Sequence, residues 1–453
     1  MDTPAVPMPK DERERQILDK LTAIQDKLLL LKRDRTQYIR SQDVMLLHDQ
    51  LVEQVRQLNE IRKGEHREEN RLDKVLESCL QLISLFFMTI GRTSEVPAAY
   101  ALTSTIKRLL DHLTEASLFS AKDLTSISKT LSRLDGILAN DESDTYLVEL
   151  LAHRSARCKA TLAKLQKQLD QLDEPLQVIY ERLISIIRSM SLANTKSKFS
   201  TTEVQKLKAK LREIEESMVD GKFVGEDGKE LRGSEAVSDL LRRCFLWSDI
   251  VLERKGVIPE SFRDKYNVLI SIRNDLEKLS ITQAWSLRET DLYDFQRQLD
   301  KIDEARVDGN WLDQDGNPAE LYVQRTMLYL IRRSYGYIYY LMNSSEPVSE
   351  ALLPIYNQLQ TLKRCLIEVK NSGGVGSVRE LYPYSMKLNS IDNMRVDGKF
   401  IVGNDIPEGQ GSVSELLAEC FELNYELRVA AEEAAGGLED DESQSPAPQT
   451  TAT

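Results

Sequence analysis

Apolar residues recur at intervals of three and four along most of the chain, as in the series Leu18, Leu21, Ile24, Leu28 and Leu31. This spacing places them on one face of an α-helix, with polar residues on the opposite face. Strict alternation of apolar and polar residues, which is typical of a half-buried strand, is nearly absent. The pattern therefore predicts an all-α fold.

A segment that contains the tripeptide Val-Asp-Gly occurs three times, at 219–221, 307–309 and 396–398, with spacings of 88 and 89 residues. In each copy a Leu and an Ile precede the tripeptide at the same distances, and an aromatic residue follows two positions after the glycine. Self-similarity at a fixed period is the signature of a repeat protein. The chain is therefore predicted to contain copies of one structural unit.

Two further signatures frame each copy. A tyrosine followed by apolar residues at +3 and +6 opens it, at Tyr180, Tyr266 and Tyr356, and an apolar helical segment closes it. Weaker copies occur upstream, where Leu134–Gly136 resembles the tripeptide and the segment ending at Cys79 resembles the one ending at Cys420. We predict tandem three-helix units of about 88 residues, stacked into an elongated helical array in which each unit buries its apolar face mainly against its neighbours.

The signatures and the composition of the two ends predict the domain boundaries. The proline-containing N-terminus and the acidic Gly/Ser/Pro-containing C-terminus have little apolar material to bury, so both are predicted to be disordered. The predicted segments are a disordered N-terminus at 1–10, a degenerate helical unit at 11–92, helical units at 93–165, 166–254, 255–343 and 344–430, and an acidic disordered tail at 431–453.

Each Val-Asp-Gly tripeptide is interpreted as a helix terminator, because glycine readily adopts the left-handed conformation that commonly ends a helix. An apolar residue just beyond it would pack back over the last turn. The alternative is a ligand loop, and Asp313–Asn317 resembles part of a calcium-binding EF-hand loop. However, Trp311 and Tyr322 occupy positions where that loop needs carboxylates, so the match fails. The residues assigned to the structural repeat loops are Asp220, Gly221, Phe223, Asp308, Gly309, Trp311, Asp397, Gly398 and Phe400.

Charge and cysteine content narrow the class of protein. The chain has 73 acidic against 60 basic residues, a net charge of −13, which argues against a nucleic-acid-binding protein. The five cysteines are far apart, so reduced thiols in the cytoplasm or nucleus are expected rather than a disulfide framework or a zinc site. The most apolar stretch, 80–90, is shorter than the ~20 residues of a membrane span. Any membrane association is therefore expected to be peripheral.

Candidate chemistry is scarce. All four histidines precede residue 154, and no familiar nucleophile, zinc or phosphate-loop motif occurs. The acidic residues are spread along amphipathic helices, where a solvated face is the ordinary explanation. The sequence therefore predicts that the protein is not an enzyme and holds no cofactor or metal.

Two pairs of arginines occupy matching positions in adjacent units, Arg242–Arg243 and Arg332–Arg333. The guanidinium group suits carboxylate and phosphate, so aligned pairs would form a binding ladder for an acidic or phosphorylated ligand. The alternative is a structural role in which each arginine pairs with a neighbouring carboxylate. The third matching position holds Ala418–Glu419, so the repeat folds without the pair.

The repeated V-D-G-K-F segments at 219–223 and 396–400, together with G-x-D-I-P-E-G-Q at 403–410, resemble a fungal family of uncharacterised helical proteins. The similarity extends from Gln16 to about Val429. The family includes cytoplasmic and nuclear proteins and a Golgi-associated partner of a ubiquitin-specific protease, so the resemblance implies an adaptor. The predicted function is a non-enzymatic protein–protein interaction scaffold that positions a deubiquitinating enzyme. The alternative is a phosphate- or small-ligand-binding protein that uses the aligned arginines.

Overall fold

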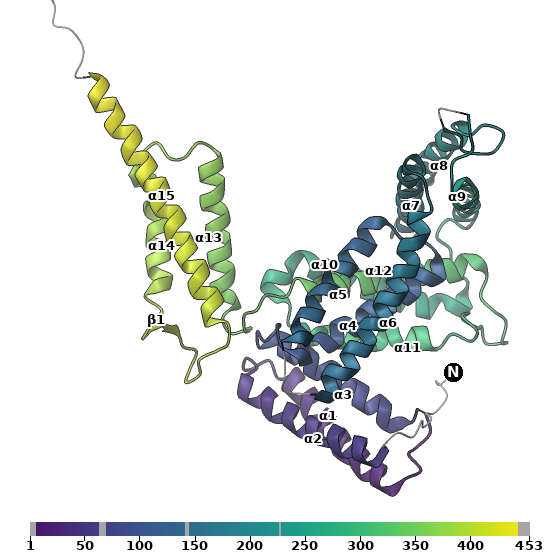
Figure 1. The fold of residues 1–453 in the computed structure, drawn as a ribbon, viewed down its shortest axis with the longest axis horizontal. Helices are drawn as coiled ribbons and strands as arrows, with labels where there is room; N and C mark the ends of the chain where they lie inside the picture. The colour runs from purple at the N-terminus through teal and green to yellow at the C-terminus, as the bar shows by residue number, and fades with distance from the viewer. Residues whose placement is uncertain (1–5, 63–68, 141–144, 226–227, 443–453) are drawn as a thin grey trace, which may run out of the picture.

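The computed structural model describes residues 6–62, 69–140, 145–225 and 228–442, and it confirms the predicted all-α fold (Figure 1). Within this part of the chain there are fifteen α-helices, short 3₁₀ helices and one two-stranded sheet. The α-helices are α1 (Glu12–Arg33), α2 (Ser41–Arg62), α3 (Arg71–Thr89), α4 (Ala99–Ala116), α5 (Ala121–Ala139), α6 (Thr145–Asp170), α7 (Glu174–Asn194), α8 (Thr201–Glu216), α9 (Ser234–Arg254), α10 (Glu260–Ser286), α11 (Leu292–Glu304), α12 (Leu321–Asn343), α13 (Leu353–Asn371), α14 (Tyr382–Asp392) and α15 (Gln410–Glu442). The strands are β1 (Arg395–Val396) and β2 (Lys399–Phe400), and the 3₁₀ helices are η1 (Val96–Ala98), η2 (Glu289–Asp291) and η3 (Val378–Leu381).

Consecutive helices pack in threes, which we call modules 1 (α1–α3), 2 (α4–α6), 3 (α7–α9), 4 (α10–α12) and 5 (α13–α15). In every module the third helix packs on both of the others. A buried cysteine marks the repeat, because its thiol points to a leucine carbonyl of the first helix in three modules. The pairs are Cys79 with Leu21 (3.6 Å), Cys244 with Leu183 (3.9 Å) and Cys420 with Leu359 (3.5 Å).

The modules are not arranged in space simply in their sequence order. Module 4 contacts each of the other four, through α11 against α3, α12 against α4 and α7, and α10 against α13. Modules 1, 2 and 4 form a body, from which modules 3 and 5 project on opposite sides (Figure 1). Module 4 is therefore the centre of the array.

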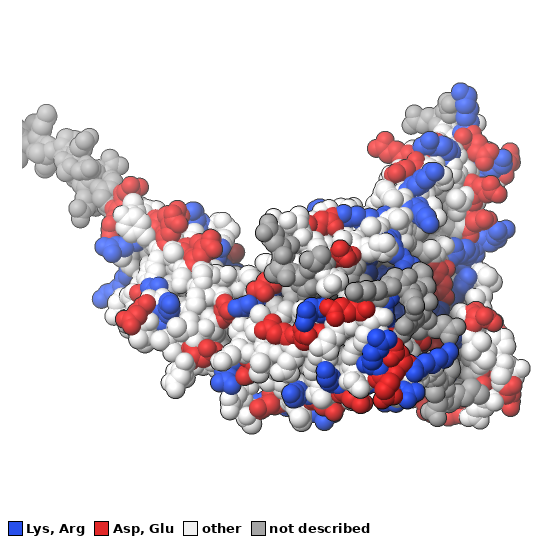
Figure 2. Space-filling view, turned by 60° about the horizontal axis from the view of Figure 1, so that its bottom comes forward, with Lys and Arg blue, Asp and Glu red and all other residues white. Residues whose placement is uncertain are grey.

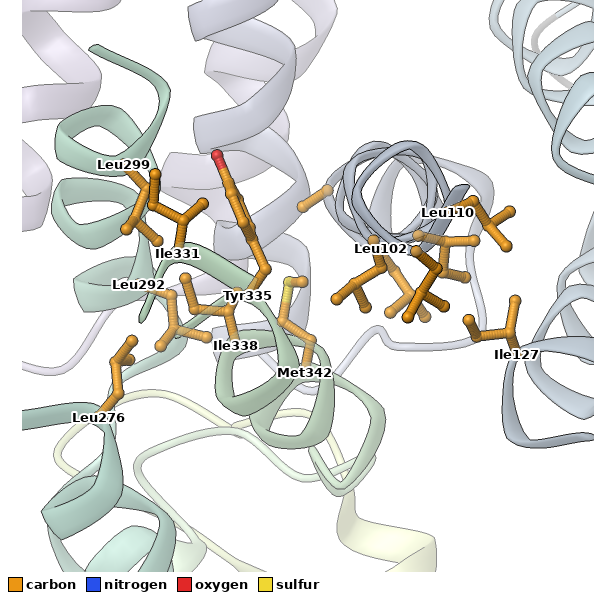
Figure 3. Packing of buried hydrophobic residues seen from close by; sticks show 14 of the residues in the cluster. Leu102, Leu110, Ile127, Leu276, Leu292, Leu299, Ile331, Tyr335, Ile338 and Met342 are labelled. Carbon is orange, nitrogen blue, oxygen red and sulfur yellow. The ribbon is translucent and has the colours of Figure 1, made fainter. Parts of the chain in front are cut away.

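The central helix α12 is enclosed because its apolar side chains occur around most of its circumference. Tyr335, Ile338 and Met342 are each at most 2% exposed. Figure 3 shows them between Leu292 and Leu299 of α11 on one side and the leucines of α4 on the other. A large continuous core therefore joins modules 2 and 4.

The interface between modules 2 and 4 also contains a buried charged network. The carboxylate of Asp303 on α11 accepts a hydrogen bond from His112 Nε2 of α4 at 3.0 Å, and both side chains are 4% exposed. Arg306 lies 2.8 Å from the other carboxylate oxygen of Asp303, and Arg108 of α4 lies 3.7 Å from Asp303. Charged groups in a dry interior need such partners, so the network holds α4 and α11 in one register.

A second buried ion pair joins module 5 to the body. Arg288, just before η2, forms two hydrogen bonds with Glu350, at 2.6 and 2.9 Å, and the two side chains are only 9% and 13% exposed. Arg288 also donates to the carbonyl of Asp34 at 2.8 Å, and the backbone N–H of Glu350 donates to the carbonyl of Thr89 at 3.0 Å. We call this contact the joint. It brings modules 1, 4 and 5 together at one point.

Three predicted boundaries need correction. The boundary at 165 lies inside α6, which continues to Asp170. The segment 6–10 is anchored rather than disordered, because Pro9 is buried and the carbonyl of Pro7 accepts a hydrogen bond from the backbone N–H of Arg71. Helix α15 runs to Glu442, because the Ala- and Glu-rich sequence 430–435 has high helix propensity. Residues 1–5 and 443–453 of the predicted disordered ends lie outside the described residues.

Candidate functional site

The three Val-Asp-Gly tripeptides form tight β-hairpins rather than helix caps. In the first, the backbone groups of Val219 and Lys222 exchange hydrogen bonds of 2.9 and 3.0 Å, and Val307 and Asn310 do the same in the second. In the third, Val396 of β1 pairs with Lys399 of β2. All three Asp residues have φ near +50° and all three Gly residues have φ between +76° and +82°, the signature of a type I′ turn. The interpretation as a helix terminator is therefore wrong, since each preceding helix ends before the valine.

The hairpins connect the second helix of a module to the third. The aromatic residues that follow them, Phe223, Trp311 and Phe400, are at most 2% exposed. Trp311 Nε1 donates to the carbonyl of Ile302 in α11 at 2.9 Å, and the backbone N–H of Phe223 donates to Ser234 Oγ of α9 at 2.9 Å. These contacts are structural, and among them no side chains converge as a ligand site would require.

Gly309→Ala is expected to lower the free energy of unfolding by about 1–2 kcal/mol, because a side chain is strained at a left-handed position. The matched control is Gly136→Ala. Gly136 belongs to the upstream Leu-Asp-Gly sequence, which lies inside α5 and forms no hairpin, and a Cβ there meets no atom within 4 Å. This control is expected to stabilise by about 0.5–1 kcal/mol. If urea unfolding shows a change of the same sign in the free energy of unfolding for both variants, the assigned turn is contradicted.

The structure does not bring the four predicted arginines into one ladder. Arg242 on α9 is exposed and pairs with Asp239 one turn earlier, at 2.6 Å. Arg243 donates to the carbonyl of Ala116 at the end of α4, at 2.8 Å. Arg332 and Arg333 on α12 instead line a separate cleft. The predicted alignment of the two pairs is therefore wrong, because α9 and α12 present their arginines to different neighbours.

This cleft, which we call the cationic cleft, has a volume of about 330 Å³ and lies where modules 2, 3 and 4 meet. Its polar lining contains four cations and one carboxylate, namely Lys122, Arg188, Arg332, Arg333 and Asp123. The remaining lining is mostly apolar or aromatic and comes from α4, α5 and α12. Those residues are Leu109, Leu113, Ser126, Ile127, Tyr329, Gly336 and Tyr339.

The single carboxylate of the cleft is already neutralised. Asp123 is the third residue of α5, where it forms a capping box with Ser120. Arg188 of α7 donates to Asp123 at 2.5 Å. Burial by itself raises the pKa of Asp123, but the hydrogen bond and charge of Arg188 outweigh it and hold that pKa below its usual range. Asp123 and Arg188 therefore form a paired, ionised unit.

Arg332 has no such partner. Within the described residues it has no hydrogen bond and no ion pair, although it is partly buried beside Arg188. Burial lowers the pKa of Arg332 to about 10, and the charge of Arg188 acts in the same direction. Arg333, by contrast, is exposed, and its guanidinium stacks on the ring of Tyr337 at 4.6 Å. The cleft thus contains more cations than carboxylates, and the guanidinium of Arg332 is the partly buried cation without a partner among the described residues.

Over the face seen in Figure 2, basic and acidic side chains are interspersed without a continuous positive surface. The described residues contain no group of three or more His, Cys, Asp or Glu side chains that could hold a metal ion, and no helix among them is long and apolar enough to span a bilayer. Burial raises the pKa of the Cys79 and Cys244 thiols to about 12, so these are not activated nucleophiles.

Sequence reasoning missed Lys122, Asp123, Arg188 and Gly336. Arg188 did leave a signal, since it is the only charged residue in the apolar run 183–190. Such a lone charge on a buried helix face requires either a partner or a ligand. Lys122 and Gly336 left none, because their place in the cleft depends on how three modules meet.

Comparisons with known proteins give relatives over nearly the whole chain. Residues 169–289 and 346–447 match a family model described as "protein of unknown function (DUF2408)". A CUB1 family protein of Schizosaccharomyces pombe is 38% identical over 437 residues, which cover 94% of each chain. The "Cu(2+) suppressing and bleomycin sensitive protein 1" of Saccharomyces cerevisiae is 35% identical over 509 residues, covering 94% of this chain and 92% of the relative. No solved structure matches the chain.

Proposed function

We propose that this chain, which belongs to the CUB1 family of fungal proteins, is a non-enzymatic scaffold that holds a protein partner. The partner that we propose is a ubiquitin-specific protease. The proposal includes a cytoplasmic location, with nuclear or peripheral Golgi association as well. The observation that carries the scaffold is an exposed apolar face on module 5.

This face, which we call the α14 face, consists of Tyr382, Met386, Met394 and Val396, which are 64%, 54%, 54% and 55% exposed. Tyr382 and Met386 are one helical turn apart on α14, and Met394 and Val396 lie in the turn and the strand that follow it. The buried residues Leu388 and Ile391 of α14 lie in the core that α14 forms with α13 and α15 inside module 5.

Exposed apolar side chains are unfavourable in water, and a group of them on one module is typical of a surface that binds another protein. Methionine and tyrosine are also enriched at protein interfaces. Module 5 projects from the body, so its outer face is accessible to a large partner (Figure 1). These features support a scaffold more than a reaction centre.

Met386→Lys is expected to weaken partner binding at least tenfold, because a charge would have to be buried at the centre of the interface. The measurement is the binding of purified fungal ubiquitin-specific proteases to the immobilised full chain, beside cross-linking mass spectrometry in native lysate. Leu46→Lys on α2 is the matched control, since Leu46 is 60% exposed and lies in module 1.

The scaffold proposal fails if no stoichiometric partner cross-links to module 5. If another protein cross-links there and no ubiquitin-specific protease binds, the identity of the partner is wrong and the scaffold remains. Equal loss in Met386→Lys and Leu46→Lys would show that the α14 face is not the binding surface.

The alternative function, binding of an anionic ligand, is favoured by the cationic cleft. Two of the four arginines predicted for it, Arg332 and Arg333, line that cleft, whereas Arg242 and Arg243 do not. In a scaffold, such a cleft would serve as a second contact with the same partner.

A further inference from the structure

We propose that the cationic cleft binds a phosphate monoester, and that this group belongs to a phosphorylated serine or threonine in a segment of the partner protein. The proposal rests on the scaffold function for its partner, but its site is separate. The α14 face is in module 5, whereas the cleft is formed by modules 2, 3 and 4. The two can therefore fail independently.

The charge of the cleft fits a dianion. Of its four cations, only Arg188 is compensated by the carboxylate of Asp123, at 2.5 Å. Among the described residues Arg332 lies near Arg188 and has no hydrogen bond or ion pair, since Asp123 attracts it only at longer range, and the exposed Lys122 has none there either. Like charges held together in a partly desolvated place are unfavourable unless an anion joins them. A phosphate monoester supplies about two negative charges and three acceptor oxygens.

The type of cation favours phosphate over a single carboxylate. Arginine presents a planar fork of donors that matches two phosphate oxygens at once, and clusters of arginines are the usual means of recognising phosphorylated segments. Here Arg188 comes from α7 and Arg332 from α12, so the donors approach from two directions. A group with three equivalent oxygens satisfies both better than a carboxylate does.

The size of the cleft points to a ligand larger than free phosphate. Leu109, Leu113 and Ile127 form part of its floor together with the ring of Tyr329, and each is at most 7% exposed. Inorganic phosphate would fill only part of the volume of about 330 Å³. A peptide that carries a phosphorylated residue would fill more of it. Because Arg332 is partly buried inside the cleft, a flat bilayer surface would not reach it.

Gly336 keeps the cleft open. It lies within α12, and a Cβ added there would meet no atom within 4 Å. Glycine is unfavourable in a helix interior, and packing does not require it here. A larger side chain at this position would project into the cleft without disturbing the helix, so Gly336→Leu blocks the site without changing its charge.

The experiment measures binding of the full chain to a fluorescent degenerate peptide library with a fixed central phosphoserine, against the same library with serine. We expect at least tenfold tighter binding of the phosphorylated library, decreasing with salt. Arg332→Gln and Gly336→Leu should each reduce that binding at least tenfold. Arg242→Gln and Gly136→Leu are the matched controls and should leave it unchanged, since both positions lie outside the cleft.

Equal affinity for the two libraries, or unchanged binding by Arg332→Gln, would overturn the proposal. Inorganic phosphate or phosphoinositide-containing vesicles that compete as strongly as the phosphorylated library would refute the assignment to a peptide. Circular dichroism of each variant shows whether it has folded. If the partner still binds through the α14 face while the phosphorylated library does not bind, the phosphate site fails and the scaffold stands.

Discussion

Asp303→Asn is expected to lower the free energy of unfolding by about 3–5 kcal/mol, because it removes the buried carboxylate that pairs with His112 and Arg306. Asp303 is 4% exposed, and it accepts from His112 at 3.0 Å and pairs with Arg306 at 2.8 Å. The measurement is urea unfolding at neutral pH. Asp249→Asn is the control, since Asp249 forms an exposed ion pair with Lys208 that contributes at most about 1 kcal/mol.

The same variant has a defined pH dependence. Burial raises the pKa of Asp303, but the hydrogen bond from His112 and the nearby charges of His112, Arg306 and Arg108 outweigh it, so the pKa is lowered overall. A carboxyl group with a lowered pKa stabilises the folded state above its unfolded pKa of about 3.9, and this contribution is lost as pH falls through the folded pKa. The stability difference between wild type and Asp303→Asn should therefore shrink below about pH 4.

Asp300, which lies 3.4 Å from Arg108 of the same network, has its pKa shifted in the opposite direction. Burial raises its pKa, although the charge of Arg108 and a hydrogen bond from Tyr335 oppose the rise. Asp300 is present in both wild type and Asp303→Asn. Its effect on the pH dependence of stability is therefore the same in both proteins to first order, and it cancels in the difference between them. A stability difference that stays constant from pH 6 to pH 3 would contradict the role assigned to Asp303.

Arg288→Met is expected to destabilise the joint by about 3–5 kcal/mol. The carboxylate of Glu350 is only 13% exposed, and it would lose the guanidinium that neutralises it. The joint is also tightly packed: Gly91 has φ +86°, and a Cβ there would lie 2.6 Å from the backbone N of Ser349. The backbone at the joint therefore has little room to move and bring another cation to Glu350. We expect module 5 to separate from the body in part of the population.

Small-angle X-ray scattering would show this separation as a larger radius of gyration, while far-ultraviolet circular dichroism would show little loss of helix. Arg364→Met on α13 is the control, since Arg364 is exposed and has no partner among the described residues. An unchanged radius of gyration, together with unchanged stability, would show that other contacts hold module 5. Tyr38 with Asp405 and Arg92 with Glu408 are two such contacts.

The helical fold and the three-helix repeat were predictable because both depend on short-range periodicity. Apolar spacing such as that from Leu18 to Leu31 specifies a helix face directly, and the recurrence of similar segments shows which helices correspond. The burial of Phe223, Trp311 and Phe400 agrees with their apolar character. What periodicity does not specify is which modules meet, because module 4 contacts modules distant in sequence as well as its neighbours.

The hairpins were missed although their signal is local. Asp-Gly is a strong type I′ turn sequence, but that signal is usually sought between long alternating strands. Here the flanking strands are two residues each or single bridges, so no alternation surrounds the turn. The helix-terminator interpretation correctly predicted that the glycine of each tripeptide is left-handed. It did not predict the positive φ of Asp220, Asp308 and Asp397.

The cationic cleft could not be derived from the sequence, because its residues come from four helices of three modules. Matching repeat positions suggested that Arg242–Arg243 and Arg332–Arg333 would act together. Equivalent positions in two modules have different surroundings once one module is central and the other projects. That Arg332 has no partner among the described residues is therefore a property of the assembled array.

The central place of module 4 has a consequence for synthesis on the ribosome. Modules 1, 2 and 3 emerge first, yet the surfaces of α3, α4 and α7 that meet α11 and α12 stay uncovered until about residue 343 has left the exit tunnel. Nascent chains with uncovered apolar surface aggregate readily and are bound by chaperones. We therefore expect chaperones to bind the nascent chain most strongly after modules 1, 2 and 3 have emerged and before module 4 is complete.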